Sequence, residues 1–118
     1  MFKLYGYKQC QSCRLAEKWL NQHHVPYESI PIRDTPPSRT ELSRMANLYG
    51  GIKPLVNTSG QAYRKLNLKE QWGVKTDGQW LDLLASNGHL VKRPFLVGTH
   101  TLKVGFNPDE WSDLLNRL

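Results

Sequence analysis

The sequence predicts an α/β protein in which a mixed sheet is built from both ends of the chain, with an all-helical insertion between them. Three observations predict this class. A strand, an amphipathic helix and a second strand make a β-α-β unit over residues 2–32. Two short apolar runs and a final helix make a β-β-α unit from residue 95 onward. The stretch between these units shows helical and loop patterns only.

The N-terminal unit follows from the spacing of its apolar residues. Residues 2–6, FKLYG, alternate apolar and polar side chains as a strand does. A helix is expected from Cys13, with an apolar face made of Leu15, Ala16, Trp19 and Leu20. Pro26 excludes further helix, and residues 27–32 predict the second strand. Because a helix separates the two strands, we expect them to be parallel.

The central helices are marked by their ends. Ser38 or Thr40 caps a helix that has Glu41 in its first turn and stops at Gly50-Gly51. Its apolar face is expected to consist of Leu42, Met45, Ala46 and Tyr49. Further helices are expected over residues 61–68 and about 78–86, the second with Trp80, Leu81, Leu83 and Leu84 as apolar residues.

The C-terminal unit predicts an antiparallel hairpin and a helix. Residues 95–98 and 101–105 are apolar runs joined by a tight turn. Asn107 caps the last helix and Pro108 occupies its first position. Its buried face is expected to contain Trp111, Leu114, Leu115 and Leu118. The whole order is that of a thioredoxin-like fold, with fold parts at about 1–34 and 89–118 and the insertion at about 35–88, in one domain over 1–118.

Size and composition narrow the class of protein. A chain of 118 residues can bury a hydrophobic core without metals or several disulfides. It contains no apolar run near the roughly 18 residues that span a bilayer, and its start lacks a signal-peptide pattern. We therefore expect a cytoplasmic protein with no membrane partner. In that reducing compartment a structural disulfide is disfavoured, so paired cysteines indicate redox, catalytic or metal chemistry.

The charge is moderately basic and uneven. The net charge is +6, but residues 107–118 carry three acidic side chains against Arg117, so the first 106 residues carry +8. Such a charge suits an acidic partner or an anionic substrate, and it also suits an ordinary solvated surface. Because no basic run is interleaved with aromatics, direct binding to nucleic acid is not expected.

The two cysteines, Cys10 and Cys13, form a C-x-x-C motif where the first strand passes into the first helix. Unpaired N–H groups and the partial positive charge of a helix N-terminus stabilise a thiolate, and Lys8 and Arg14 add positive charge nearby. Cys13, one turn into the helix, is expected to be less exposed and placed to attack a mixed disulfide at Cys10. The pattern thus predicts Cys10 as nucleophile and Cys13 as resolving thiol.

Two other interpretations of the motif are a zinc site and a pair of inert thiols. Zinc needs about four ligands, and none of His23, His24, His89 and His100 is spaced to pair with the cysteines. We therefore expect no metal site and interpret the histidines as surface residues. A pair of buried, inert thiols remains the alternative to a reactive pair.

Arg93-Pro94 stands just before the first strand of the hairpin. In thioredoxin-like folds this loop carries a cis-proline that faces the cysteine turn. By that analogy a cis Pro94 directs Arg93 at the thiols, where its guanidinium can hold an anion by paired hydrogen bonds. The alternative is a solvated arginine at the start of a strand.

Four segments, YGYKQCQSCRLAEKWL, LVNTSGQAYRKLNL, LVKRPFLV and KVGFNPDEW, resemble the ArsC/Spx family in order and spacing. The resemblance covers essentially the whole chain. Its most specific parts are the cysteine turn, Asn57-Thr58 followed by Tyr63 and Leu66, and Arg93-Pro94. It implies a thioredoxin fold with a helical insertion.

The reductase branch of this family implies an enzyme. Glutathione-dependent arsenate reductases have a nucleophilic cysteine, which Cys10 matches, and three oxyanion-binding arginines, one of which Arg93 matches. Asn57 stands at the second position, and residues 105–107 at the third contain no arginine. Each lost charge-assisted anchor is worth roughly 1.5–3 kcal/mol, so arsenate itself is not expected as the substrate. The candidate substrate- or anion-binding residues are Gln11, Ser12, Arg14, Asn57 and Pro94.

The regulator branch implies a different use of the same motif. Spx-type regulators carry C-x-x-C in this turn and use its oxidation to tune binding to the C-terminal domain of the RNA polymerase α-subunit. Gly50-Gly51 lies near the glycine that they use at this contact, but Ser59 stands where they have an arginine. We favour a thiol-disulfide oxidoreductase that binds no cofactor and takes electrons from glutathione or a thioredoxin or glutaredoxin system. A redox-sensing regulator is the alternative.

Overall fold

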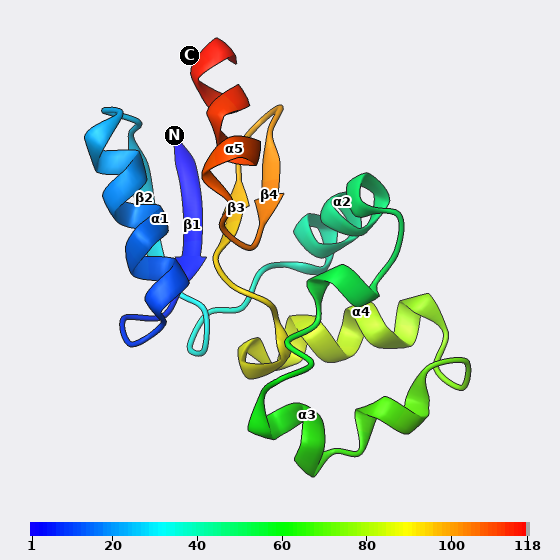
Figure 1. Cartoon of the computed structure of the whole chain (residues 1–118). Coiled ribbons are helices and arrows are strands. Elements are labelled where there is room, and N and C mark those ends of the chain that lie inside the picture. Colours follow the sequence, from blue (N-terminus) through cyan, green and yellow to red (C-terminus); the bar gives the residue numbers. More distant parts are fainter. Residues whose placement is uncertain (118) are drawn as a thin grey trace. The chain divides into compact units, whose positions relative to one another are not determined.

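The computed structural model describes residues 1–117 and divides the chain into two compact units. One unit combines Met1–Pro31 with Arg93–Leu118, and the other consists of Ile32–Lys92. Figure 1 shows the sheet in the first unit and the helices of the second. None of the helices formed by the described residues is long and apolar enough to cross a membrane.

The first unit contains a four-stranded sheet with the order β2-β1-β3-β4. Its strands are β1 (Phe2–Gly6), β2 (Tyr27–Pro31), β3 (Phe95–Val97) and β4 (Leu102–Val104). β1 and β2 are parallel, whereas β3 is antiparallel to both β1 and β4. The expected β-α-β and β-β-α units are therefore confirmed, and the mixed sheet is thioredoxin-like.

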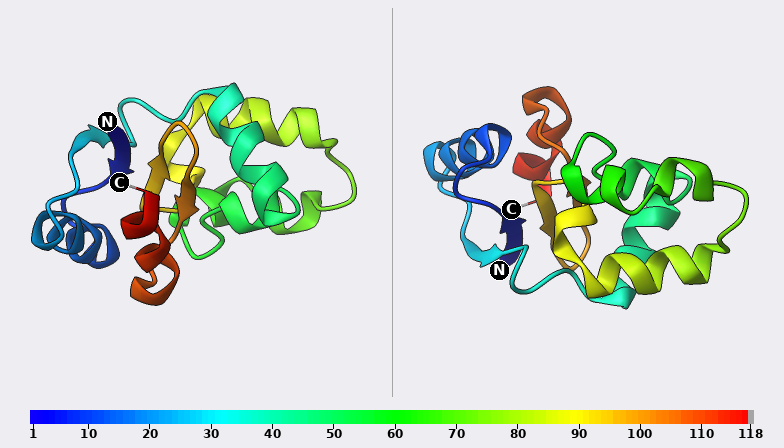
Figure 2. Two further views of the ribbon diagram at one scale, coloured as in Figure 1. Left: turned by 90° about the horizontal axis from the view of Figure 1, so that it is seen from above. Right: turned by 90° about the horizontal axis from the view of Figure 1, so that it is seen from below.

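Helices α1 (Gln11–Gln22) and α5 (Pro108–Trp111) share one face of this sheet (Figure 2). Leu4 of β1 and Leu96 of β3 are register partners and belong to one buried cluster. The cluster also contains Ala16, Leu20, Val25, Trp111 and Leu114. Because α1 is buried along this cluster, the end of β1 and the start of α1 hold the cysteine turn in place.

Three expectations for the first unit need correction. The helix α1 begins at Gln11, before Cys13, and its residue Leu15 is 47% exposed because the buried face follows Cys13, Ala16 and Leu20. After α5 the chain continues as a 3-10 helix over Ser112–Arg117. With three residues per turn, Trp111 and Leu114 align toward the core, and Leu115 turns outward, 38% exposed. Leu118 lies outside the described residues.

The second unit contains α2 (Arg39–Tyr49), α3 (Gln61–Lys65) and α4 (Asp77–Ser86), with the 3-10 helices η1 (Lys53–Leu55), η2 (Leu68–Gln71) and η3 (Gly88–Leu90). Ser38, one of the two predicted caps, forms a capping box with Glu41, and Gly50 ends α2 in the left-handed conformation as expected. The helix predicted over 61–68 is shorter, because Asn67 adopts a positive φ of 53° between α3 and η2. The core of this unit includes Leu42, Met45, Leu55, Trp80, Leu84 and Leu90.

Candidate active site

The turn between β1 and α1 places both thiols at the N-terminus of a helix. Cys10 is the N-cap of α1, and its backbone N–H donates to the Tyr7 carbonyl oxygen at 3.0 Å. Both cysteines are free thiols; Cys10 is half-buried and Cys13 is only 2% exposed. Gly6 makes room for the buried thiol, since a Cβ at this position would lie 3.3 Å from Cys13 Sγ.

The pKa of Cys10 is lowered from the ordinary thiol value. Partial burial, the largest single influence, raises this pKa, but it is outweighed by several lowering influences together, of which the hydrogen bonds from the Cys13 thiol and the Ser12 hydroxyl are the strongest. The backbone N–H of Cys13 and the charge of Arg93 lower it further. Cys10 makes no side-chain cap hydrogen bond with the described residues, so the helix acts on its sulfur through an oriented N–H dipole.

The Cys13 thiol behaves in the opposite way. Burial, followed by the hydrogen bond to Cys10, raises the pKa of Cys13 to about 12. The Tyr7 backbone and the Arg93 charge pull the pKa of Cys13 downward without compensating for the burial. The pair therefore consists of one thiol that ionises readily and one that holds its proton, as a nucleophile and a proton-bearing partner would.

Arg93 supplies a cation to this turn. The Arg93–Pro94 peptide bond is cis, as the analogy predicted. The guanidinium carbon lies 6.0 Å from the centroid of the Tyr7 ring, within cation–π range. Its Nη1 atom is buried and has no hydrogen-bond partner among the described residues. A buried donor without a partner is costly, so this atom is suited to hold an anionic group of a ligand.

The other predicted site residues occupy different surroundings. Ser12 is half-buried, with its Oγ 3.2 Å from Cys10 Sγ. Gln11 and Arg14 are exposed, and Arg14 lines an open groove with Glu17, Lys18, Asn21, Gln22 and Tyr27. Pro94 is buried beside Arg93. Asn57 belongs to the other unit, where its backbone N–H donates to the Leu90 carbonyl at 2.8 Å.

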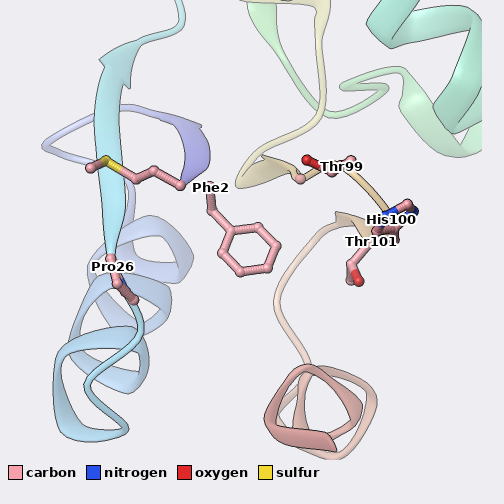
Figure 3. Close-up of a pocket in the computed structure, with 7 residues that line it drawn as sticks. Phe2, Pro26, Thr99, His100 and Thr101 are labelled. Atoms are coloured by element: carbon pink, nitrogen blue, oxygen red, sulfur yellow. The ribbon is translucent and has the colours of Figure 1, made fainter. Parts of the chain in front are cut away.

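A pocket of about 380 Å³ lies at the far end of β1 from the cysteine turn. Figure 3 shows the Phe2 ring between Pro26 on one side and the turn of Thr99, His100 and Thr101 on the other. The lining of this pocket includes none of the residues that the sequence predicted for the site. The chemistry-bearing groups are therefore gathered at the opposite end of the sheet, around Cys10.

Metal-ligating side chains do not gather in the described part of the chain, where no group of three or more His, Cys, Asp and Glu residues could hold an ion. The four histidines are exposed, as predicted. His23 packs its ring against Trp19, with the ring centroids 4.3 Å apart.

Two residues that contribute to the site were not predicted. Tyr7 provides the ring under Arg93 and the carbonyl that closes the cysteine turn, and Gly6 accommodates the Cys13 thiol. Both precede the motif directly, in YGYKQC. A tyrosine and a glycine just before the C-x-x-C motif were the available signal, but a position next to a motif does not by itself show that a side chain contacts it.

Comparison with known proteins places this geometry in a family. The family model of the ArsC family matches residues 5–114. The chain belongs to the ArsC family. Among its ArsC-family relatives is the "Uncharacterized protein YusI" of Bacillus subtilis, 40% identical over 92% of this chain and 93% of that protein. The "Global transcriptional regulator Spx" of Streptococcus pyogenes is 31% identical over 99% of this chain and 87% of that protein.

Solved ArsC-like structures share the fold. A protein described as ArsC family related from Bacteroides fragilis superposes with a TM-score of 0.88 and 37% identity, over 96% of each chain. A possible arsenate reductase from Streptococcus mutans gives a TM-score of 0.83 and 34% identity, over 91% of this chain and 92% of that one. The family thus includes proteins named as reductases and proteins named as regulators.

Proposed function

We propose that this ArsC-family chain is a cytoplasmic thiol-disulfide oxidoreductase with Cys10 as nucleophile and Cys13 as resolving thiol. The observation that supports it best is the pair of interacting thiols with opposite pKa shifts, the lowered one at a helix N-terminus. A thiolate is the nucleophile in disulfide exchange, and its partner must stay protonated until it is needed.

The reaction proceeds in two exchanges. The Cys10 thiolate attacks a substrate disulfide; a bond forms between the attacked sulfur and Cys10, and the other substrate sulfur leaves as a thiolate that takes a proton from solvent. Cys13 then loses its proton and attacks the Cys10 sulfur. The second substrate thiolate leaves, and a Cys10–Cys13 disulfide remains. The substrate has gained two electrons and the protein has lost two. Two glutathione molecules, or one thioredoxin or glutaredoxin dithiol, are then oxidised to a disulfide and reduce Cys10–Cys13 back to the dithiol.

The pKa of Cys13 changes during this sequence. Burial and the neighbouring Cys10 sulfur raise it. Once Cys10 is in a mixed disulfide its negative charge is gone, so the electrostatic part of the increase disappears and Cys13 loses its proton more readily. Resolution is thereby coupled to the first exchange.

Arg93 has the role of holding negative charge at the site. Its buried Nη1 can donate to a carboxylate or oxyanion of the substrate, and its charge also favours thiolates. Arsenate is not proposed as the substrate, because the two further arginines of arsenate reductases are missing from the matching positions.

The rate of Cys10 alkylation as a function of pH tests this function. We expect a midpoint below the ordinary thiol value in the wild type and a higher midpoint in Arg93→Ala, because a positive charge next to the sulfur is lost. Mass spectrometry of the oxidised protein should show a Cys10–Cys13 disulfide or a glutathione adduct on Cys10. A Cys10 that titrates as a free thiol in both proteins would contradict the proposal.

A redox-sensing regulator is the second candidate, favoured by relatives with regulatory names. Besides Spx, the "Regulatory protein MgsR" of Bacillus subtilis is 33% identical over 90% of this chain. In this function the Cys10–Cys13 disulfide would alter a contact with RNA polymerase, through the α-subunit. Gly50 and Gly51 lie near the position of the glycine that Spx-type regulators use to contact the polymerase. They line a pocket of about 390 Å³ together with Lys53 and Trp72.

A pull-down with the C-terminal domain of the polymerase α-subunit, with and without oxidant, distinguishes the two candidates. Retention of the α-subunit domain that changes with oxidation supports the regulator, and Lys53→Glu should then weaken this retention. If the domain is retained in neither redox state, the regulator is rejected and the reductase is left.

A further inference from the structure

Ser12 contacts the sulfur that the proposed reaction uses. It is the second residue of α1, and its Oγ lies 3.2 Å from Cys10 Sγ. Side chains in a helix lean toward its N-terminus, so this serine points at the turn and not along the helix. When Cys10 is ionised the sulfur can only accept, and the hydroxyl must be the donor of this hydrogen bond.

The Cys13 thiol is the other side-chain donor to Cys10. This donor is consumed by the reaction, because Cys13 gives up its proton when it resolves the mixed disulfide. The Ser12 hydroxyl takes no part in sulfur exchange and keeps its proton. It is also half-buried, so water competes with the hydrogen bond less than at an open surface.

We propose that Ser12 is a positioning residue: its hydroxyl donates a hydrogen bond to the Cys10 thiolate and fixes the orientation of this sulfur at the N-terminus of α1. This inference rests on the proposed function, because it assigns a role only if Cys10 is the nucleophile. It adds a distinction between two donors: the Cys13 thiol is present only in the reduced, protonated state, whereas the Ser12 hydroxyl is present in every state.

Because the Ser12 hydroxyl and the Cys13 thiol donate to the same Cys10 sulfur, the effects of removing them should depend on each other. In the wild type, loss of the Ser12 hydroxyl is partly compensated, because the Cys13 thiol still donates to the sulfur. In a Cys13→Ala background this compensation is absent. The effect of Ser12→Ala on Cys10 should therefore be larger in that background, and the two substitutions should be non-additive, as expected for residues in one network.

The experiment measures the alkylation rate of Cys10 by iodoacetamide against pH, with adduct mapping by mass spectrometry. Ser12→Ala, Ser12→Thr and Ser112→Ala are made with Cys13 present and with Cys13→Ala. Ser112 is a matched control, because its hydroxyl donates to the Asp109 carbonyl three residues earlier and contacts neither cysteine. Thermal unfolding followed by circular dichroism verifies that each variant is folded.

We expect Ser12→Ala to raise the midpoint and to lower the rate at a pH below it by about three- to tenfold in the Cys13→Ala background. The decrease should be smaller with Cys13 present. Ser12→Thr, which keeps the hydroxyl, should restore the wild-type profile, and Ser112→Ala should have no effect.

Folded Ser12→Ala proteins with an unchanged Cys10 profile in both backgrounds would overturn the inference, as would a Ser12→Thr protein that behaves like alanine. These outcomes are distinct from failure of the proposed function. The proposed function fails if the midpoint of Cys10 alkylation in the wild type is that of a free thiol. The role of Ser12 fails if this midpoint is lowered in the wild type and equally lowered in Ser12→Ala.

Discussion

Cys10 and Cys13 are identical side chains that their surroundings make chemically different. Cys10 sits at the solvent-facing N-cap, where donors and Arg93 outweigh partial burial. Cys13 lies beneath the turn against Gly6, and burial dominates. Three positions along the chain therefore separate a thiol that ionises readily from one that keeps its proton.

This asymmetry predicts a pH dependence of stability with two windows. Folding lowers the pKa of Cys10, so its thiolate stabilises the folded state above the ordinary thiol pKa, and this contribution is lost as the pH falls through the lowered value. Folding raises the pKa of Cys13 to about 12, so its contribution is present below the ordinary thiol pKa and is lost as the pH rises toward 12.

Urea unfolding at a series of pH values measures both windows. Compared with wild type, Cys10→Ala should lack the increase in unfolding free energy with pH below the ordinary thiol pKa. Cys13→Ala should lack the decrease above it. Identical slopes in the wild type and in both variants would show that the thiols have the same pKa folded and unfolded.

The helices differ in how their N-termini are satisfied. α2 begins with a capping box of Ser38 and Glu41, and α4 begins with one of Thr76 and Gln79. α1 begins instead with Cys10, which makes no side-chain cap hydrogen bond with the described residues. The helix that begins after Cys10 thus leaves its N-terminal N–H dipoles available to a negative charge.

Substitutions at these N-caps should have opposite effects on stability. Ser38→Ala removes a capping box and should lower the free energy of unfolding by about 1 kcal/mol. Cys10→Ser gives α1 a good N-cap and should raise it by roughly 0.5 kcal/mol at a pH where the thiol is protonated, while removing the reactive thiol.

Chemical denaturation at a pH below the midpoint of Cys10 alkylation checks both changes, with Thr40→Ala as a control, because Ser38 and not Thr40 supplies the cap. A Ser38→Ala protein as stable as wild type, or a Cys10→Ser protein less stable than wild type, would contradict this account of the helix ends.

At the scale of the whole molecule, each unit has its own buried core. Leu96 and Trp111 are fully buried in the unit that contains the sheet, and Leu84 and Trp80 are buried in the helical unit. Every group that shifts the pKa of Cys10 belongs to the unit with the sheet. Stability is therefore spread over the chain, whereas the thiol electrostatics come from one unit.

Truncation of one core residue in each unit tests this separation. Leu84→Ala should cost about 2–5 kcal/mol of unfolding free energy and leave the pH profile of Cys10 alkylation unchanged under native conditions. Leu96→Ala should cost a similar amount, and the exposed Leu48→Ala should cost little. A Cys10 midpoint that moves in a folded Leu84→Ala protein would show that the helical unit also controls the thiol.

Much of the fold could be predicted because its signals are local. The alternation in residues 2–6, the cap at Ser38, the stop at Gly50 and the start at Pro108 each depend on neighbours within a turn or two. The errors arose where local pattern competed with packing or backbone geometry. Asn67 interrupted a predicted helix, and the 3-10 turn after Trp111 rotated Leu115 outward.

The sequence by itself determined the C-x-x-C motif, its place at a helix start and the order of strands and helices, because these follow from residue types and short-range spacing. Only the tertiary structure decided that β3 lies beside β1, that the Arg93 guanidinium lies by Tyr7, and that the pKa values of the two thiols shift in opposite directions. The physical reason is that a pKa depends on desolvation and on charges brought close in space, and residue 93 reaches residue 10 only through the pairing of strands distant in the chain.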